Sequence, residues 1–291
     1  FRTALFDDDR IDPRAMQRFS RGQSTEDTPL PSAGAQREAP ARANAPAEPG
    51  GLGIDVTFVD ADDTEAFRRA LTPRTKALYA ETIGNPQLNV CDIAALADVA
   101  HGAGVPLVID STLASPFLCR PIEHGADIVI HSVTKYLGGH GTTMGGIVVE
   151  SGRFPWDNGN FPQMTEPSRG YHGVRFFETF GDFGFTMKAR METMRTLGPT
   201  LAPLSAFLLL QGIETLHLRM PRHCESALAV ARHLSAHPAV EWVNYPLLPG
   251  NRYEPLARRY LPRGAGGILT FGVRGGAAAG ERLIEAVQFL S

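Results

Sequence analysis

Five side chains that could do chemistry together lie at or just after the ends of three apolar segments of this 291-residue sequence. Lys135 comes directly after the run "DIVIHSVT", with Ser132 and Thr134 beside it. Asp110 ends the run "PLVID", and Asn85 follows the run "KALYAE". An amine, a carboxylate, an amide and two hydroxyls can together bond to a carbonyl carbon, transfer protons and bind an anion.

Each of these residues, taken alone, also has an ordinary structural explanation. Asp110 can cap the turn "DST", Asn85 before Pro86 is a common turn pair, and the two hydroxyls can simply end a strand. Lys135 is harder to explain in this way, because the strand-like run before it is apolar. A lysine buried there would be costly unless it were neutralised or bonded.

The elements that must position these residues are predicted from the period of the apolar side chains. Strands are predicted over residues 53–60, 76–81, 105–110, 127–135 and 145–150. Helices are predicted over "TEAFRRAL" and over "CDIAALADVAHGAG", which Asp92 can cap, and a short helical crossover over "CRPIEHGA". This alternation predicts an α/β fold with a mostly parallel sheet covered by helices. The five residues are then expected at the carboxyl edge of the sheet, where such folds bind ligands.

The rest of the ordered sequence predicts a second, smaller α/β unit. Residues 153–200 are rich in Phe, Gly and Pro, and they precede a helical stretch over 204–237 that we expect Pro221 to kink or split. The runs "VEWVNYP" and "GGILTFGVRGG" read as strands and "AAAGERLIEAVQFL" as a helix. We therefore predict a large domain over 53–214 and a truncated C-terminal small domain over 215–291.

The first 52 residues differ from the rest in composition. Ala, Pro, Gly and Ser dominate, and the segment lacks both helical and strand periods. Such a composition buries too little apolar surface to offset the entropy of ordering, so we expect disorder, centred on 20–50. A frameshifted stretch is the alternative interpretation.

Composition excludes several classes of protein. A net charge of −3 argues against nucleic acid or an anionic membrane as partner. The longest apolar run, "LSAFLLL", is far shorter than a membrane-spanning helix, and no signal-peptide pattern is present. The 3 cysteines and 9 histidines have no metal-ligand spacing, and an odd number of scattered cysteines favours a reducing, cytoplasmic compartment over a disulfide framework.

Three segments carry a resemblance to a known family. "ETIGNP", "VIDSTLASP" and above all "HSVTKYLGGHGTTMGGIVVE" closely resemble the Cys/Met-metabolism (trans-sulfuration) family of pyridoxal-phosphate (PLP) enzymes. In both the family and this sequence the aspartate lies midway between the asparagine and the lysine. Further segments, including "FPQMTEPSRGYHG" and "ETLHLRMPRHCESAL", are similar to the O-acetylhomoserine sulfhydrylase branch. The resemblance covers about residues 53–291 and implies fold type I of the PLP-dependent transferases, as in aspartate aminotransferase.

The family pattern implies a role for each of the five residues. Lys135 would form a Schiff base with the aldehyde of pyridoxal 5'-phosphate and later move protons. Asp110 would lie against the pyridine nitrogen and keep it protonated, and Asn85 would donate a hydrogen bond to the phenolic oxygen of the ring. Ser132 and Thr134 would bind the phosphate.

The resemblance also implies an activity with several variants. In the sulfhydrylase branch, O-acetyl-L-homoserine and sulfide or a thiol give L-homocysteine and acetate in methionine and cysteine biosynthesis, and the enzymes are homotetramers. A cystathionine γ-synthase and a γ-lyase share the lysine motif and stay open as alternatives. So does a catalytically inactive fragment that retains the motif.

Several positions depart from the family pattern. Ser111 stands where the family usually has Asn after the aspartate. The family's phosphate-cradling glycine loop, its ring-stacking tyrosine and its N-terminal arm are not recognisable before "GIDVTFVD". The arginine that binds the substrate carboxylate would fall beyond Ser291. We therefore expect this chain to hold the lysine side of the site and to lack much of the binding side.

Overall fold

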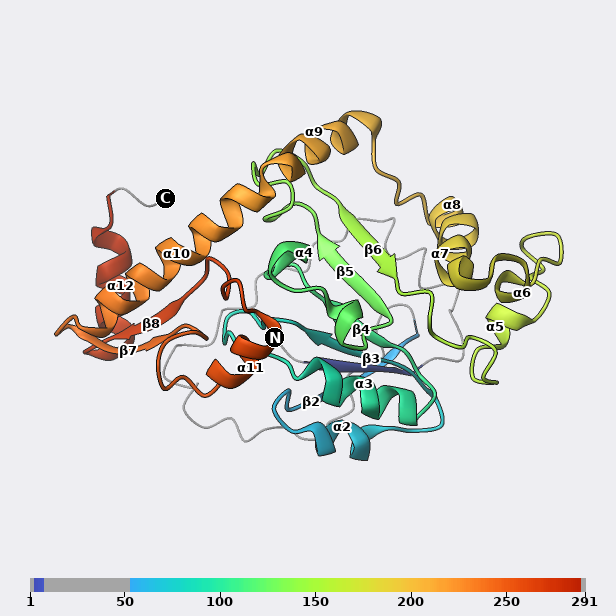
Figure 1. The fold of residues 1–291 in the computed structure, drawn as a ribbon, viewed down its shortest axis with the longest axis horizontal. Coiled ribbons are helices and arrows are strands. Elements are labelled where there is room, and N and C mark those ends of the chain that lie inside the picture. The colour runs from blue at the N-terminus through green and yellow to red at the C-terminus, as the bar shows by residue number, and fades with distance from the viewer. Residues whose placement is uncertain (1–2, 8–52, 289–291) are drawn as a thin grey trace.

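A computed structural model describes residues 3–7 and 53–288 of the chain (Figure 1). The strands are β1 (Thr3–Asp7), β2 (Asp55–Val59), β3 (Thr75–Glu81), β4 (Leu107–Asp110), β5 (Ile128–Ser132), β6 (Gly146–Glu150), β7 (Val240–Asn244) and β8 (Thr270–Val273). The α-helices are α2 (Thr64–Ala70), α3 (Ile93–Gly102), α4 (Ser115–Leu118), α5 (Pro162–Thr165), α6 (Phe176–Phe180), α7 (Gly184–Lys188), α8 (Arg195–Leu197), α9 (Pro203–Glu214), α10 (Leu216–Ser235), α11 (Glu254–Tyr260) and α12 (Gly276–Ala286).

The larger sheet has six strands in the order β2-β1-β3-β4-β5-β6. The pairs β3–β4 and β4–β5 are parallel, whereas β1 is antiparallel to both of its neighbours and β6 is antiparallel to β5. Strands β2, β3, β4 and β5 therefore all run in one direction, in agreement with the predicted α/β fold. The parallel strands β3, β4 and β5 lie together at the centre of the molecule (Figure 1).

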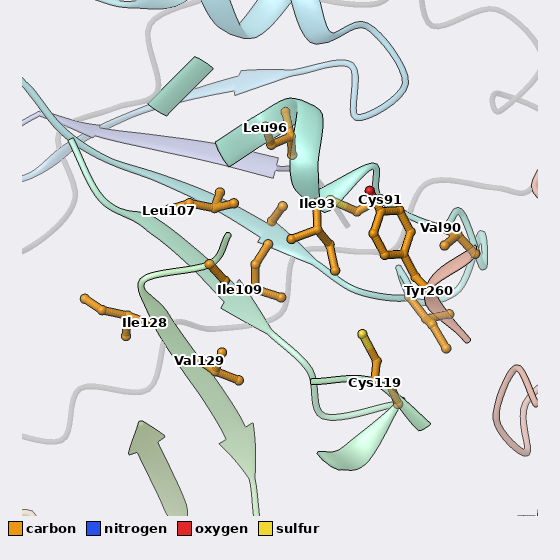
Figure 2. Packing of buried hydrophobic residues seen from close by; sticks show 14 of the residues in the cluster. Val90, Cys91, Ile93, Leu96, Leu107, Ile109, Cys119, Ile128, Val129 and Tyr260 are labelled. Carbon is orange, nitrogen blue, oxygen red and sulfur yellow. The ribbon is translucent and has the colours of Figure 1, made fainter. Parts of the chain in front are cut away.

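Helix α3 shows how the sequence builds one of the layers on this sheet. Asp92 caps it by accepting a hydrogen bond from the Ala95 N–H at 3.3 Å, as predicted. Its apolar residues lie on one buried face, and the helix packs against β3 and β4. Figure 2 shows Ile93 and Leu96 of α3 together with Leu107 and Ile109 of β4 in the same apolar cluster.

Each of the two central strands has one buried face, and the other face is partly buried. Leu107 and Ile109 in β4 are 0% exposed, and Ile128 and Val129 in β5 are 4% and 3% exposed. Each such side chain contributes about 1.5–3 kcal/mol when it is fully buried. This packing fixes the register of β4 and β5, and so fixes the positions of the polar residues at their carboxyl ends.

The predicted long helix is divided, but not at the predicted residue. It breaks at Thr215, between α9 and α10, whereas Pro221 lies inside α10. At the break, Thr215 leaves the helical conformation with φ −96° and ψ 1°. The side chains of Thr215 and Arg219 both donate to the Gly212 carbonyl there, which compensates for the interrupted helical bonding.

The C-terminal part of the chain contacts the first α/β unit through α11 and the residue before it. Tyr260 donates to Asp92 at 2.5 Å, and Tyr253 donates to Asp62 at 2.8 Å. Strands β7 and β8 form a separate two-stranded sheet, near which α10 and α12 lie (Figure 1). The division into domains over 53–214 and 215–291 stays a prediction, although its boundary falls at the Thr215 break.

One strand was not predicted from the sequence. Strand β1 comes from the first ten residues and pairs with β2 and β3, within a segment that we expected to be disordered. Residues 8–52, which carry most of that prediction, lie outside the described residues. Within residues 53–288, no helix combines the length and the apolar character needed to cross a bilayer.

Candidate functional site

The three parallel strands bring the five predicted residues to one edge of the sheet. Asp110 ends β4, Ser132 ends β5, and Thr134 and Lys135 lie in the turn directly after β5. Asn85 lies in the loop after β3. Because β3, β4 and β5 are parallel neighbours, their carboxyl ends share one edge.

Asp110 is held at that edge by donors from two directions. Its Oδ1 accepts a hydrogen bond from the Thr112 N–H at 2.8 Å, and its Oδ2 accepts one from the Tyr79 hydroxyl at 3.3 Å. Burial, followed by the negative charge of Asp110, raises the pKa of Tyr79, so its hydroxyl stays protonated and keeps donating. The half-buried carboxylate therefore has a fixed orientation.

A continuous line of hydrogen bonds connects Asp110 to Lys135. Thr112, bonded to Asp110 through its N–H, accepts a hydrogen bond from the Ser132 N–H on its Oγ1 at 2.8 Å. The Oγ of Ser132 lies 2.6 Å from the Oγ1 of Thr134, and the carbonyl of Ser132 accepts from the Lys135 N–H at 3.3 Å. We call this series, Asp110–Thr112–Ser132–Lys135, the site line.

The side chain of Lys135 is available for reaction. Lys135 is exposed, and its Nζ makes no hydrogen bond or ion pair with any residue in the described part of the chain. The sequence led us to expect a buried lysine with a cost to be offset, and this expectation is wrong. The apolar strand ends at Ser132, and a turn carries Lys135 away from the core.

Asn85 is connected to the site through Glu81. The Asn85 N–H donates to Glu81 Oε2 at 3.2 Å, and Glu81 lies beside Asp110 in the β3–β4 register. Burial raises the pKa of Glu81, and the charge of Asp110 adds to this effect. The side chain of Asn85 is exposed, so the structure places Asn85 after β3 at the same edge of the sheet as the other four residues, without a direct bond to them.

Beneath the site, Ser111 takes part in a buried polar group. Its Oγ accepts from the Thr82 hydroxyl at 3.0 Å, and its carbonyl lies 3.0 Å from Nδ1 of His131. Burial lowers the pKa of His131, so the neutral ring is favoured. The departure from the family's usual Asn is therefore accommodated by a hydroxyl pair between β3 and β4.

Two residues of the site were not predicted from the sequence. Thr112 bonds to both Asp110 and Ser132, and Tyr79 bonds to Asp110. Thr112 lies in the "DST" turn, where a hydroxyl two residues after the aspartate was a usable signal. The alternation of β3 would have placed Tyr79 and Glu81 on the same face, but it does not indicate which face points towards Asp110.

The arrangement suits a ligand that carries an aldehyde, a basic ring nitrogen and a phosphate. A lysine with a free amine can bond to the aldehyde carbon, and an oriented carboxylate can pair with a protonated ring nitrogen. In the Ser132–Thr134 pair a single hydrogen bond uses one hydroxyl proton, which leaves the other to donate to a phosphate oxygen.

Known proteins with similar sequences belong to a family that uses pyridoxal phosphate, in agreement with the chemistry of these residues. The family model of the Cys/Met metabolism PLP-dependent enzymes matches residues 48–291. The O-acetyl-L-homoserine sulfhydrylase of Leptospira meyeri is 49% identical over 249 residues, which cover 82% of this chain and 56% of the relative. The homocysteine synthase of Schizosaccharomyces pombe is 47% identical over 243 residues, covering 82% of this chain and 57% of the relative. The chain thus spans about half the length of the curated relatives it matches.

Solved structures give the same result for the fold. A Campylobacter jejuni protein assigned as an O-acetylhomoserine (thiol)-lyase, which carries N'-pyridoxyl-lysine-5'-monophosphate, matches with a TM-score of 0.76 and 33% identity over 80% of this chain and 58% of that one. The O-acetylhomoserine sulfhydrylase of Wolinella succinogenes matches with a TM-score of 0.72 and 38% identity over 81% of this chain and 65% of that one. The fold predicted from the resemblance is confirmed, and the chain belongs to the Cys/Met metabolism PLP-dependent enzymes.

Proposed function

We propose that this chain binds pyridoxal 5'-phosphate through Lys135 and takes part in γ-replacement on O-acetyl-L-homoserine. Sulfide or a thiol would replace the acetyloxy group, giving L-homocysteine or its thioether and acetate. The observation that carries the proposal is the site line, which ends at the backbone N–H of Lys135, a residue whose side-chain amine has no partner among the described residues. When bound, the cofactor supplies an electron sink for the negative charge that develops at the α-carbon of the amino acid.

The residues of the chain have separate tasks in this proposal. Lys135 binds the cofactor covalently, and its Nζ holds and returns the proton taken from the substrate carbons. Asp110, oriented by Tyr79 and Thr112, pairs with the protonated ring nitrogen. The hydroxyl pair of Ser132 and Thr134 binds the phosphate.

Asn85 has the least support of the five residues. We propose that its amide donates to the phenolic oxygen of the cofactor ring, as the family pattern implies. Its exposed side chain at the rim, beyond Glu81, is consistent with a contact that forms only when the ligand is present.

The similar proteins support sulfide or a thiol as the acceptor. Relatives with 40–49% identity are named O-acetyl-L-homoserine sulfhydrylase or homocysteine synthase, and we extend that activity to this chain as a proposal. An assay that supplies either sulfide or cysteine with O-acetyl-L-homoserine separates a sulfhydrylase from a cystathionine γ-synthase. We expect acetate release with sulfide and little with cysteine.

A second candidate is a non-catalytic chain that keeps the lysine motif. The exposure of Lys135 favours it, because catalysis by such cofactors needs a site from which water is largely excluded. Titration with pyridoxal phosphate decides whether the site forms, since the lysine-linked cofactor absorbs near roughly 420 nm. If the band appears and acetate is released, the enzyme proposal stands. A band without turnover supports the second candidate, and the absence of a band at saturating cofactor contradicts the enzyme proposal.

We also propose self-association of the chain. Strand β6 is at the edge of the sheet that the described strands form, and its residues Ile147 and Val148 are 46% and 50% exposed. Helix α9 adds exposed side chains, with Leu204 at 69% and Phe207 at 54%. Apolar surface of this kind is typical of protein interfaces.

A reducing, cytoplasmic location is proposed from the cysteines. Cys91, Cys119 and Cys224 are all free thiols and are buried.

A further inference from the structure

The backbone immediately after Lys135 forms a compact turn. The Gly138 N–H donates to the Val133 carbonyl at 2.9 Å, and the Gly139 N–H donates to the carbonyl of Lys135 itself at 2.8 Å. We call residues 133–139 the lysine turn. Because the Lys135 side chain has no partner among the described residues, its direction depends on how firmly this backbone is held.

Arg219, on α10, holds the lysine turn from outside. Its Nη1 donates to the Tyr136 carbonyl at 2.7 Å and its Nη2 to the Leu137 carbonyl at 3.3 Å. The same guanidinium donates to the Gly212 carbonyl at 2.7 Å and, through Nε, to Thr215 Oγ1 at 2.9 Å. One planar group thus ties the two residues that follow Lys135 to the junction of α9 and α10, where the two helices follow one another along the molecule (Figure 1).

The backbones at this contact touch, which leaves little freedom for the turn to shift. A Cβ built on Gly212 would lie 2.1 Å from the Gly138 carbonyl oxygen. A Cβ on Gly139, whose φ is +74°, would lie 2.5 Å from Nη1 of Arg219. Gly212 is therefore required by the close approach of α9 to the lysine turn, and Gly139 is favoured by its positive φ.

Arg219 has no acidic partner that would give it another role. No ion pair between Arg219 and an acidic residue is present within residues 53–288, and burial lowers the pKa of Arg219. A guanidinium suits this position because its planar group of five N–H donors can supply all four of these bonds, whereas an ammonium has three donors and no planar arrangement.

We propose that Arg219 is a positioning residue for Lys135, acting through the carbonyls of Tyr136 and Leu137. The proposal rests on the proposed function, in which Lys135 carries the cofactor. It gives a reason for an arginine that lies 83 and 82 residues from its two acceptors in the lysine turn. It also predicts that loss of Arg219 weakens cofactor binding without touching the cofactor.

The test compares four variants of the full chain. Arg219→Gln removes the guanidinium, and Arg219→Lys keeps the charge but not the planar group of donors. Thr215→Val removes the bond from Nε of Arg219 and the bond from Thr215 to the Gly212 carbonyl, and it leaves both bonds from Arg219 to the lysine turn in place. Arg222→Gln is the matched control, because Arg222 is on the same helix and makes only an exposed ion pair with Glu225.

Two measurements are made on each variant. Hydrogen–deuterium exchange of the peptide that spans 133–141 is measured without cofactor, and the dissociation constant of pyridoxal phosphate is measured from the absorbance near roughly 420 nm. For Arg219→Gln we expect exchange at Gly138 and Gly139 to quicken and the dissociation constant to rise, each by roughly tenfold or more. Both values for Arg219→Lys should lie between those of Arg219→Gln and those of the original chain. For Thr215→Val and Arg222→Gln, the exchange rate and the dissociation constant should stay within about twofold of the original values.

The outcomes separate this inference from the proposed function. If the original chain gives no band with pyridoxal phosphate, the proposed function fails, and exchange in the lysine turn still shows whether Arg219 holds it. Unchanged exchange in both Arg219 variants overturns the positioning role. The positioning role is also overturned if Thr215→Val raises the exchange in the lysine turn as much as Arg219→Gln does. Arg219 would then stabilise only the junction between α9 and α10. If Arg219→Gln does not fold, the test compares the exchange and the dissociation constant of Arg219→Lys with those of Arg222→Gln. Equal values in these two variants would overturn the positioning role.

Discussion

At the scale of single residues, the geometry of the site depends on Thr112. Its N–H orients Asp110 and its hydroxyl accepts from the Ser132 N–H, so one short side chain joins β4 to the end of β5. A threonine and a valine have nearly the same shape, but valine cannot accept a hydrogen bond. The residue is therefore a sensitive point at which to test the site line.

Replacing Thr112 with valine should destabilise the chain and loosen the site. Thr112→Val leaves the half-buried Ser132 N–H without its acceptor, which costs about 1–3 kcal/mol in the free energy of unfolding. Thr112→Ser keeps the hydroxyl and is the matched control. Urea unfolding measures both variants, and equal stability of the two would contradict the bond between Thr112 and Ser132.

The raised pKa of Glu81 predicts a particular dependence of stability on pH. Because the folded state raises this pKa, Glu81 contributes stability at low pH that is lost as pH rises through the pKa of the folded state. Glu81→Gln removes the titration while its amide oxygen can still accept from the Asn85 N–H. The variant keeps Asp110, whose charge raises the pKa of Glu81, and Tyr79, whose pKa is raised in part by the charge of Glu81.

We therefore expect the variant and the original chain to differ in urea midpoint only above the ordinary glutamate pKa of about 4.3. Above it, Glu81→Gln should become progressively the more stable of the two. A difference that is constant from pH 4 to pH 8 would show that Glu81 titrates alike in the folded and unfolded chain.

The residues that bear on chemistry differ in how far the sequence reveals them. The positions of Lys135, Asp110 and Ser132 at one edge of the sheet were predictable because each residue ends or follows an apolar strand, and parallel strands share their carboxyl edge; their roles stay a prediction. Tyr79 and Arg219 were not, because their contacts depend on side-chain direction and on the packing of distant elements. The exposure of Lys135 was missed because the end of β5 lies at Ser132, three residues earlier than the predicted end of the strand.

At the scale of elements, α9 approaches the lysine turn too closely for any side chain at Gly212. Gly212→Ala places a methyl group 2.1 Å from the Gly138 carbonyl oxygen, so helix and turn must separate. Gly280 in α12 is the matched control, because a Cβ there meets nothing within 4 Å. Alanine is the better helix former, by about 1 kcal/mol in exposed helices.

We expect opposite signs from the two alanine variants. Gly280→Ala should raise the thermal midpoint of unfolding, and Gly212→Ala should lower it and weaken the binding of pyridoxal phosphate. A rise in both midpoints would contradict the close contact between α9 and the lysine turn.

Element boundaries show where local sequence signals were insufficient. Asp92 indicated the start of α3 correctly, because a cap acts within its own turn. The break between α9 and α10 falls at Thr215 and not at Pro221, because Arg219 and Thr215 stabilise the Gly212 carbonyl there. Strand β1 could not be predicted, since its partners β2 and β3 come from distant parts of the chain.

At the scale of the whole molecule, the apolar edge of the larger sheet predicts association. Strand β6 ends the order of the described strands and presents Val148 at 50% exposure. Val148→Lys places a charge on this edge, a change that blocks edge-to-edge pairing of strands. Light scattering coupled to size-exclusion chromatography should show a lower molar mass for the variant than for the original chain at the same concentration.

A matched control for association is available on a different surface. Val230, on α10, is 48% exposed, so Val230→Lys removes a similar apolar area elsewhere. We expect it to leave the molar mass unchanged. A monomeric original chain over the accessible concentration range would contradict the association through β6.

The covalent attachment of the cofactor to Lys135 is the central claim, and borohydride reduction tests it most directly. The chain is incubated with pyridoxal phosphate, reduced, digested and analysed by mass spectrometry, with Lys135→Ala treated in parallel. We predict one pyridoxyl adduct on Lys135, formed at substoichiometric cofactor and lost in the variant. Adducts spread over the surface lysines, or a labelling pattern that the Lys135→Ala variant does not change, would contradict the assignment.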